Sequence, residues 1–201
     1  LYSFLDGVAS PDQYAEQCRK FGHPAMAVTE HGHMGSVPDF YFAFKKNKVK
    51  PIFGCEIYFN DYELKRHELE KSGVKVRSPQ WRKDNPELAS RITRARHLTV
   101  LAKNRVGFEN LVKLTTQAYE TGLFGMGKRQ FNRIWFEKLC EFKEGLIVLS
   151  GCLNGPVCHE LRTEELRAKD GTIIKEYNDK VRINAAAAYV RKFKEVFGEK
   201  H

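Results

Sequence analysis

The amino-acid sequence predicts an α/β fold with a parallel sheet, and two features of the pattern support this prediction. Short apolar runs occur at residues 25–28, 51–53 and 146–149, and Gly or Pro residues bound them. Runs of this length are typical of buried parallel strands. Helical patterns alternate with them, and this alternation indicates repeated β-α-β units.

Length and composition predict one soluble globular domain spanning residues 1–201. The chain has 201 residues, enough for one full core, and is 42% hydrophobic and 29% charged. Its apolar runs are too short for a membrane span, and its first residues lack a signal peptide's basic start and long apolar core. Five cysteines without a CxxC pair disfavour a disulfide framework and indicate a reducing, cytoplasmic compartment.

The chain is basic, with 34 Lys and Arg against 25 acidic residues and a net charge of +9. Such a surplus favours contact with a polyanion such as DNA through its phosphates. A solvated surface that is merely basic explains the charge about equally well. Clustering at residues 45–50 and 91–96 favours the polyanion slightly.

The elements can be predicted in order. A helix over 11–22 has Ser10 as its N-cap and Gly22 as its stop. Residues 60–96 break the pattern and are expected to form a partly mobile surface insertion, with a charged helix over 63–71 and an irregular remainder. The remaining expected elements are helices over 37–48, 107–119, 136–142, 156–166 and 177–197, strands over 97–102 and 145–150, and a loop over 122–133.

Four metal-capable side chains lie at or beside the predicted strand ends: His31, Glu56, His97 and Cys152. Ligands at strand ends converge at one mouth of an α/β barrel, and mixed His, carboxylate and thiolate sets suit zinc or a similar divalent ion. Singly, His97 is more often a hydrogen-bonded strand residue and Cys152 a small buried one. Several such coincidences at equivalent positions favour a hydrolytic metal site.

The other histidines and cysteines are expected to be structural. His33, His67 and His159 fit no strand end and are predicted to lie on the surface. Cys55 should point away from Glu56, because neighbouring strand residues alternate faces. Cys18 and Cys140 lie on apolar helix faces and are predicted to belong to the core; they are not counted as ligands.

Five blocks, read together, resemble a known family. They cover residues 3–7, 27–32, 50–58, 97–104 and 145–153. In this order they resemble the PHP (polymerase and histidinol phosphatase) domain, most closely the branch at the N-terminus of bacterial DNA polymerase III alpha subunits.

The resemblance implies a distorted seven-stranded (βα) TIM-like barrel that is incomplete at both ends in this chain. It also implies up to three divalent ions, whether zinc, manganese or magnesium. Carried over by position, the metal ligands are Asp6, His31, Glu56, His97 and Cys152, of which His31, Glu56 and His97 are the catalytic set. Asp6 gains its role only in this way, since Asp6–Gly7 otherwise indicates a turn.

The chain also departs from the family pattern. The family's opening His-x-His pair and closing Asp-x-His strand are not in the sequence, so the chain is expected to be a piece trimmed at both ends. Glu30 stands where the family usually has Asp; it is one methylene longer and is expected to support His31 from behind.

Three functions follow from the resemblance. The first is metal-dependent phosphoester hydrolysis at a DNA 3′ end or single strand, a proofreading-type exonuclease; this piece alone is expected to be impaired or inert. The second is a non-catalytic module that braces the polymerase domains of the same protein and binds replisome subunits. The third, a stand-alone phosphatase for a small phosphate ester, is disfavoured by residues 150–153 and by the basic charge. Residues 45–50 and 91–96, together with Lys128, Arg129 and Arg133, are expected to form a positive rim around the metal pocket that contacts DNA phosphates.

Overall fold

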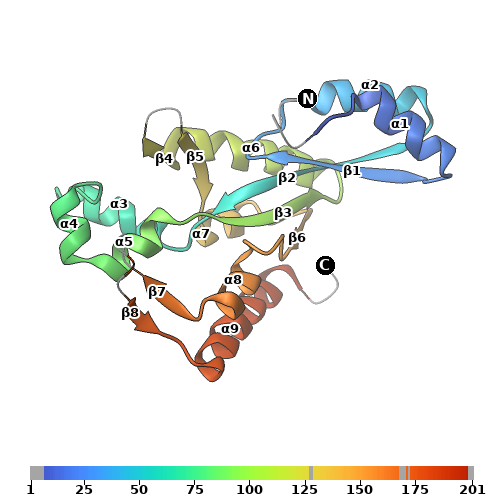
Figure 1. The fold of residues 1–201 in the computed structure, drawn as a ribbon. Coiled ribbons are helices and arrows are strands. Elements are labelled where there is room, and N and C mark those ends of the chain that lie inside the picture. Colours follow the sequence, from blue (N-terminus) through green and yellow to red (C-terminus); the bar gives the residue numbers. More distant parts are fainter. Residues whose placement is uncertain (1–6, 127–128, 168–170, 172, 199–201) are drawn as a thin grey trace.

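The structure is a computed structural model. It describes residues 7–126, 129–167, 171 and 173–198. Asp6 and Lys128 lie outside the described residues. Figure 1 shows a long twisted sheet with helices α1 and α2 at one end and helices α8 and α9 below it.

One six-stranded sheet organises the molecule around its longest strand, β2 (Lys50–Phe59). Strand β1 (Ala25–His31) runs parallel to β2, whereas β3 (Arg96–Ala102) runs antiparallel to it. The hairpin of β4 (Leu123–Met126) and β5 (Arg129–Ile134) joins β2 through β5, and β6 (Leu146–Leu149) lies beside β3.

The expectation of an all-parallel sheet is wrong for β3, which is antiparallel to both β2 and β6. An apolar run indicates that a strand is buried but not which way it points. After β2 the chain folds residues 60–95 at the end where β2 finishes, so β3 starts from that end. The described strands form an open mixed sheet, and the seven-stranded barrel is not confirmed.

Helices α1 and α2 pack on the start of the sheet. Helix α1 (Pro11–Lys20) begins with the predicted Ser10 cap, whose Oγ accepts a hydrogen bond from the backbone N–H of Gln13, and the Gln13 side chain accepts one from the Ser10 N–H. Helix α2 (Val37–Lys46) places Phe40 and Phe44 against the same cluster as Val28 of β1.

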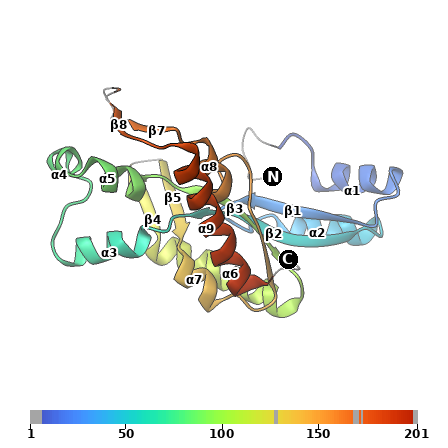
Figure 2. The ribbon, with the colours of Figure 1, turned by 90° about the horizontal axis from the view of Figure 1, so that it is seen from below.

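The main core lies on one face of the sheet. Residues Cys55, Ile57 and Phe59 of β2 point into it, together with residues from α6 (Arg105–Thr121), α7 (Phe136–Glu141) and α9 (Asp179–Phe197). Figure 2 shows α9 lying across the sheet with α6 and α7 beside it. Because strand residues alternate faces, Glu56 and Tyr58 point to the opposite side.

The segment between β2 and β3 is more helical than expected. The helix predicted over 63–71 is confirmed as α3 (Glu63–Lys71), whereas α4 (Pro79–Asp84) and α5 (Pro86–Thr93) replace the irregular structure expected after it. The predicted loop 122–133 is also wrong, because it is the β4–β5 hairpin. Arg133 of that hairpin is buried beside Glu63, and this ion pair joins the hairpin to the helices.

The C-terminal part contains a second, small sheet. Helix α8 (Pro156–Arg162) is shorter than predicted, and β7 (Glu165–Arg167) pairs antiparallel with β8 (Ile173–Glu176) before α9 begins. None of the helices in the described residues is both long and apolar enough to cross a lipid bilayer.

Candidate metal centre

The sheet brings four of the five predicted ligands together. His31 ends β1 directly beside Glu56 of β2, and Tyr58 of β2 pairs with His97 of β3. Because β3 is antiparallel, its first residues lie where β1 ends. Strand β6 runs antiparallel to β3, so Cys152, just after β6, also reaches His97. The reversed direction of β3 therefore explains why His97, at the start of its strand, lies beside His31, at the end of β1.

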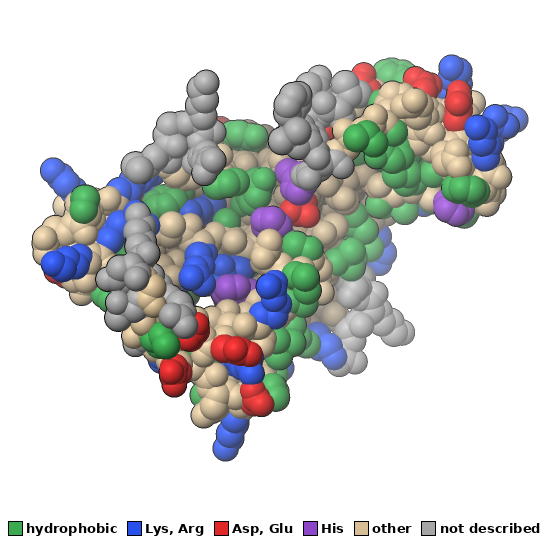
Figure 3. Space-filling view, in the orientation of Figure 1, with side chains coloured by type: hydrophobic (Ala, Val, Ile, Leu, Met, Phe, Trp, Pro, Cys, Tyr) green, Lys and Arg blue, Asp and Glu red, His purple; other side chains and the backbone are tan. Residues whose placement is uncertain are grey.

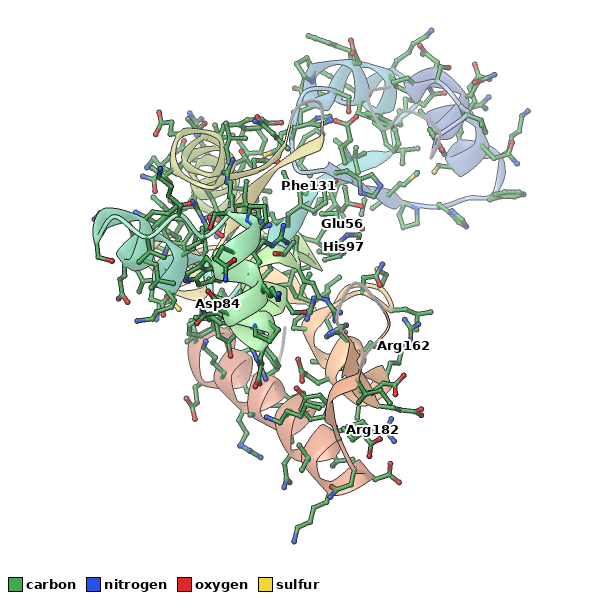
Figure 4. All side chains as sticks on the ribbon, turned by 60° about the vertical axis from the view of Figure 1, so that its left-hand side comes forward. Glu56, Asp84, His97, Phe131, Arg162 and Arg182 are labelled. Atoms are coloured by element: carbon green, nitrogen blue, oxygen red, sulfur yellow. The ribbon has the colours of Figure 1, made fainter. Side chains whose placement is uncertain are left out.

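Glu56 is the centre of the cluster. Its Oε1 lies 3.0 Å from Nδ1 of His31 and 2.9 Å from Nδ1 of His97. The Cys152 Sγ lies 3.6 Å from the same His97 nitrogen. Figure 4 shows Glu56 and His97 side by side, and Phe131 contacts the ring of Tyr58, which in turn contacts His97. We name His31, Glu56, His97 and Cys152 the Glu56 cluster.

The donor types in the Glu56 cluster are those that a divalent cation accepts. Glu56 Oε1 is buried and makes no hydrogen bond of acceptable geometry, although two imidazole nitrogens approach it. Burying a carboxylate oxygen without a partner is costly, and a cation between the donors would remove that cost. Imidazole nitrogen, carboxylate oxygen and thiolate sulfur are the donors that zinc prefers. Within the described residues, however, no group of three or more His, Cys, Asp or Glu side chains has a geometry that could hold a metal ion.

The backbone after β6 is shaped to hold Cys152 beside His97. Gly151 has a φ of +76°, and a Cβ there would lie 2.2 Å from the His97 carbonyl oxygen. The His97 N–H donates to the Asn154 carbonyl at 3.1 Å, and the Asn154 N–H donates to the Cys152 Sγ at 3.4 Å. A side chain at position 151 would push this loop away from β3.

Two residues that sequence reasoning missed, Asn132 and Tyr58, support the two histidines: Asn132 through Gly32 beside His31, and Tyr58 through the His97 ring. The Gly32 N–H donates to the Glu56 carbonyl at 2.8 Å, and Asn132 Nδ2 donates to the Gly32 carbonyl at 2.5 Å. The Tyr58 ring packs edge-on against the His97 ring. A Cβ on Gly32 would lie 2.8 Å from the Tyr58 ring, so glycine permits this close packing.

Glu30 has a different environment from its neighbour His31. It is buried, its Oε2 accepts a hydrogen bond from the Ser36 N–H at 3.0 Å, and it lies 3.4 Å from Nδ1 of His33. These contacts hold the turn between β1 and α2. His33 is therefore not a free surface histidine.

The other two histidines expected on the surface are also partly buried. His67 lies 3.7 Å from Glu63 and contacts the Trp135 ring edge-on. His159 forms a hydrogen bond with the Thr163 hydroxyl. Burial together with nearby arginines lowers the pKa of His159 to about 4. Cys55 is fully buried opposite Glu56, as expected, and burial raises the pKa of its thiol to about 12.

The predicted basic rim is only partly compatible with the structure. Arg133 is 1% exposed and cannot contact a polyanion. Residues 45–50 precede or begin β2, and Lys50 is roughly 20 Å from Glu56 along an extended strand. Arg91, Arg94 and Arg96 instead line a separate cavity, described below.

Fold and cluster together define a mixed α/β domain with a histidine-, carboxylate- and thiol-bearing site on its sheet. The sequence model of the PHP domain family matches residues 1–201. The chain belongs to the PHP domain family.

Comparison with individual proteins shows which members of the family the chain is similar to. The chain is 34% identical over 171 residues to the DNA polymerase III subunit alpha of Chlamydia muridarum, covering 84% of this chain and 12% of the relative. It is 33% identical over 167 residues to that of Helicobacter pylori, covering 83% and 12%. It is 29% identical over 199 residues to that of Aquifex aeolicus, covering 98% and 14%. The chain is thus homologous to a segment of these alpha subunits and spans about an eighth of their length.

Proposed function

We propose that this chain is the N-terminal PHP domain of a cytoplasmic replicative DNA polymerase III alpha subunit and that it hydrolyses phosphoesters with divalent metal ions. The substrate would be a DNA 3′ end, which makes the activity a proofreading-type exonuclease. The polymerase domains of the same protein and other replisome subunits would be its partners. The barrel implied by the family would require further strands beside the open sheet.

The observation that carries this proposal is the position of Glu56 Oε1, buried and within 3.0 Å of two imidazole nitrogens. His31, Glu56, His97 and Cys152 would hold the metal, and Asp6 would add to them by family position. A divalent ion supplies charge to polarise a phosphoryl oxygen and to lower the pKa of a bound water.

The residues of the chain would orient this chemistry. Asn132 and Gly32 fix the end of β1, and therefore the position of the His31 ring. The edge-on contact with the Tyr58 ring limits the rotation of the His97 ring. Such support matters because metal affinity depends on ligands being held in place before binding.

The test is Glu56→Gln, which keeps the shape of the side chain and removes its charge. Metal content after loading with Zn²⁺ or Mn²⁺ and release of a 3′-terminal nucleotide from single-stranded DNA would be measured. The measurements would use this chain and a version extended at both ends. Metal affinity should fall by about 10- to 100-fold or more, and nuclease activity should fall with it.

Glu109→Gln is the matched control, because Glu109 lies on the exposed surface of α6 and pairs only with Arg105 among the described residues. It should leave metal content and activity unchanged. If Glu56→Gln retains full metal content and full activity, Glu56 is not part of a metal site and the proposal is wrong.

The alternative is a non-catalytic module that braces the polymerase and binds replisome subunits. The same geometry gives it one argument: a carboxylate between two imidazoles forms a salt bridge when the histidines are protonated, with no metal needed. In that case Glu56→Gln would lower stability but change neither metal content nor nuclease activity.

A further inference from the structure

A second site is visible away from the Glu56 cluster. A cavity of about 560 Å³ lies between α5, α8, α9 and the β7–β8 hairpin. A cavity of this size can hold a nucleotide-sized ligand. Figure 3 shows Lys and Arg side chains gathered around a histidine in the region between α5 and α8. We name this cavity the arginine pocket.

The lining of the arginine pocket is strongly cationic. Among the described residues that line it, the acidic ones are Asp61 and Glu160. Asp61 is already paired, 3.3 Å from Lys192 and hydrogen-bonded to the Tyr189 hydroxyl. The cationic residues outnumber the acids threefold and are Arg91, Arg94, Arg96, Lys175, Arg182 and Lys192.

Two of these arginines have no acidic partner within hydrogen-bonding distance in the described part of the chain. Arg91 is paired with Glu87 and donates to the Tyr62 hydroxyl at 3.0 Å. Arg94 and Arg96 make no ion pair there. The positive potential also acts on His159, whose pKa is lowered first by burial and then by Arg96 and Arg94. Lys175 is paired with Glu87 and Arg182 with Glu164, and Glu160 attracts Arg96 electrostatically without forming an ion pair with it. Cations held this close together repel one another, and an anionic ligand would offset that repulsion.

Hydrogen bonds from two buried side chains, Asn60 and Arg133, hold the backbone that carries Arg91 and Arg94. The Asn60 Nδ2 donates to the carbonyls of Arg91 at 3.0 Å and of Arg94. Arg133 donates to the carbonyls of Ile92 at 2.5 Å and Thr93 at 2.8 Å. Asn60 and Arg133 are 2% and 1% exposed. Buried polar groups therefore fix the backbone that carries the arginines, which lowers the entropy cost of binding.

Aromatic rings complete the wall. The Arg91 guanidinium lies over the Tyr62 ring at 5.3 Å, and the Lys175 ammonium lies over the Tyr177 ring at 5.3 Å. Guanidinium groups suit phosphate through paired hydrogen bonds, and tyrosine faces suit bases by stacking. Arg96 and His97 are neighbours on β3 and so point to opposite faces, which makes this pocket distinct from the Glu56 cluster.

We propose that the arginine pocket binds a phosphate group of a nucleotide, either free or within a nucleic-acid strand. This binding requires no metal ion and does not depend on hydrolysis at the Glu56 cluster. Arg94 and Arg96 supply the charge, and Tyr62 and Tyr177 the stacking faces.

The test is binding of fluorescein-labelled oligo(dT), with pyrophosphate and thymidine monophosphate as competitors, in the presence of EDTA. Arg94→Gln and Lys175→Gln should each weaken binding by about 10-fold, the value of one charge-assisted hydrogen bond. Arg19→Gln, an exposed residue of α1 far along the sheet, is the matched control and should change binding less than about twofold. Thermal unfolding would show that each variant is folded.

The outcomes separate the two sources of phosphate. Oligo(dT) bound far more tightly than the free nucleotide, with affinity falling steeply between about 50 and 200 mM salt, would identify a nucleic-acid strand. Equal affinity for both would identify a free nucleotide or pyrophosphate. Absence of binding of all three probes in EDTA, or equal weakening by Arg94→Gln and Arg19→Gln, would overturn the proposal. Because EDTA removes metal, failure here is independent of failure at Glu56.

Discussion

Arg133→Met is expected to destabilise the protein by about 3 kcal/mol, because it leaves the buried Glu63 carboxylate with one partner fewer. Glu63 is fully buried and accepts hydrogen bonds from Arg66 at 2.8 Å and from Arg133 at 3.3 Å. Burial lowers the pKa of Arg133 to about 10, so its guanidinium remains charged at neutral pH. Methionine has similar length but neither the charge nor the donors.

The magnitude follows from the contacts that are lost. Removing one partner of a buried ion pair costs about 3–5 kcal/mol. Arg66 remains as a partner of Glu63, which reduces this cost. The two hydrogen bonds from Arg133 to the Ile92 and Thr93 carbonyls are also lost, at roughly 1–2 kcal/mol each before water replaces them at the exposed Thr93. The hydrogen-bond losses overlap with the cost of breaking the ion pair, and Arg66 lowers that cost, so the lower limit of the ion-pair range, about 3 kcal/mol, is the expected change.

Urea unfolding followed by circular dichroism measures the change. Arg105→Met is the matched control, because Arg105 forms a similar ion pair with Glu109 but its side chain is 91% exposed. The control should lose less than about 0.5 kcal/mol. Equal, small losses for the two variants would refute the view that a buried Glu63–Arg133 pair ties the hairpin to the helices. Faster amide exchange at residues 91–94 in Arg133→Met would add that the same pair orders the arginine pocket.

Three further outcomes are expected. Gly107→Ala should cost about 2 kcal/mol or more in urea unfolding, because its Cβ would lie 1.9 Å from the Gly145 carbonyl oxygen. In a thiol titration with Ellman's reagent, the exposed Cys152 should react in the native protein, and Zn²⁺ should slow it; Cys55, with its pKa raised to about 12, should react only after unfolding. Stability should fall as pH drops from 6.5 toward 4, because the unfolded state protonates His159 before the folded state does; His159→Gln should reduce that loss by up to about 2 kcal/mol.

Each of these outcomes has a control. Gly7→Ala, whose added Cβ would have no atom of the described residues within 4 Å, should be neutral, and an equal loss there would remove the steric argument for position 107. Rapid native labelling of Cys55 would contradict its burial. An unchanged pH profile in His159→Gln would show that other groups control acid stability.

The sequence located the strands well, but it did not determine their direction. The apolar runs before His31 and Glu56 and after His97 all became strands. The direction of a strand depends on where the segment before it ends. Residues 60–95 bring the chain back to the end of β2, so β3 runs antiparallel to β2. That return depends on long-range packing, which local patterns do not contain.

The β4–β5 hairpin was missed for a related reason. Glycines and basic residues at 122–133 are typical of a loop, and Arg133 has the charge of a surface residue. Its burial is explained by Glu63, which lies 70 positions earlier in the chain. A charged residue can enter the interior when such a partner exists, and a single sequence does not show the partner.

The cluster itself was easier to find than its support. His31, Glu56, His97 and Cys152 could be selected because metal-capable side chains at strand ends are chemically distinctive. Asn132, which binds the backbone 100 positions away at Gly32, carries no such signal.

The most direct test of the central claim is the absorption spectrum of the Co²⁺-loaded chain, because a cobalt–thiolate bond adds a near-ultraviolet charge-transfer band. If the Glu56 cluster binds a metal, the band should be present in the wild-type protein and in Cys158→Ser, whose cysteine lies on α8. It should disappear in Cys152→Ser and weaken strongly in Glu56→Gln. A cobalt spectrum that is the same with and without Cys152 and Glu56, or no cobalt binding in a version of the chain extended at both ends, would contradict the account.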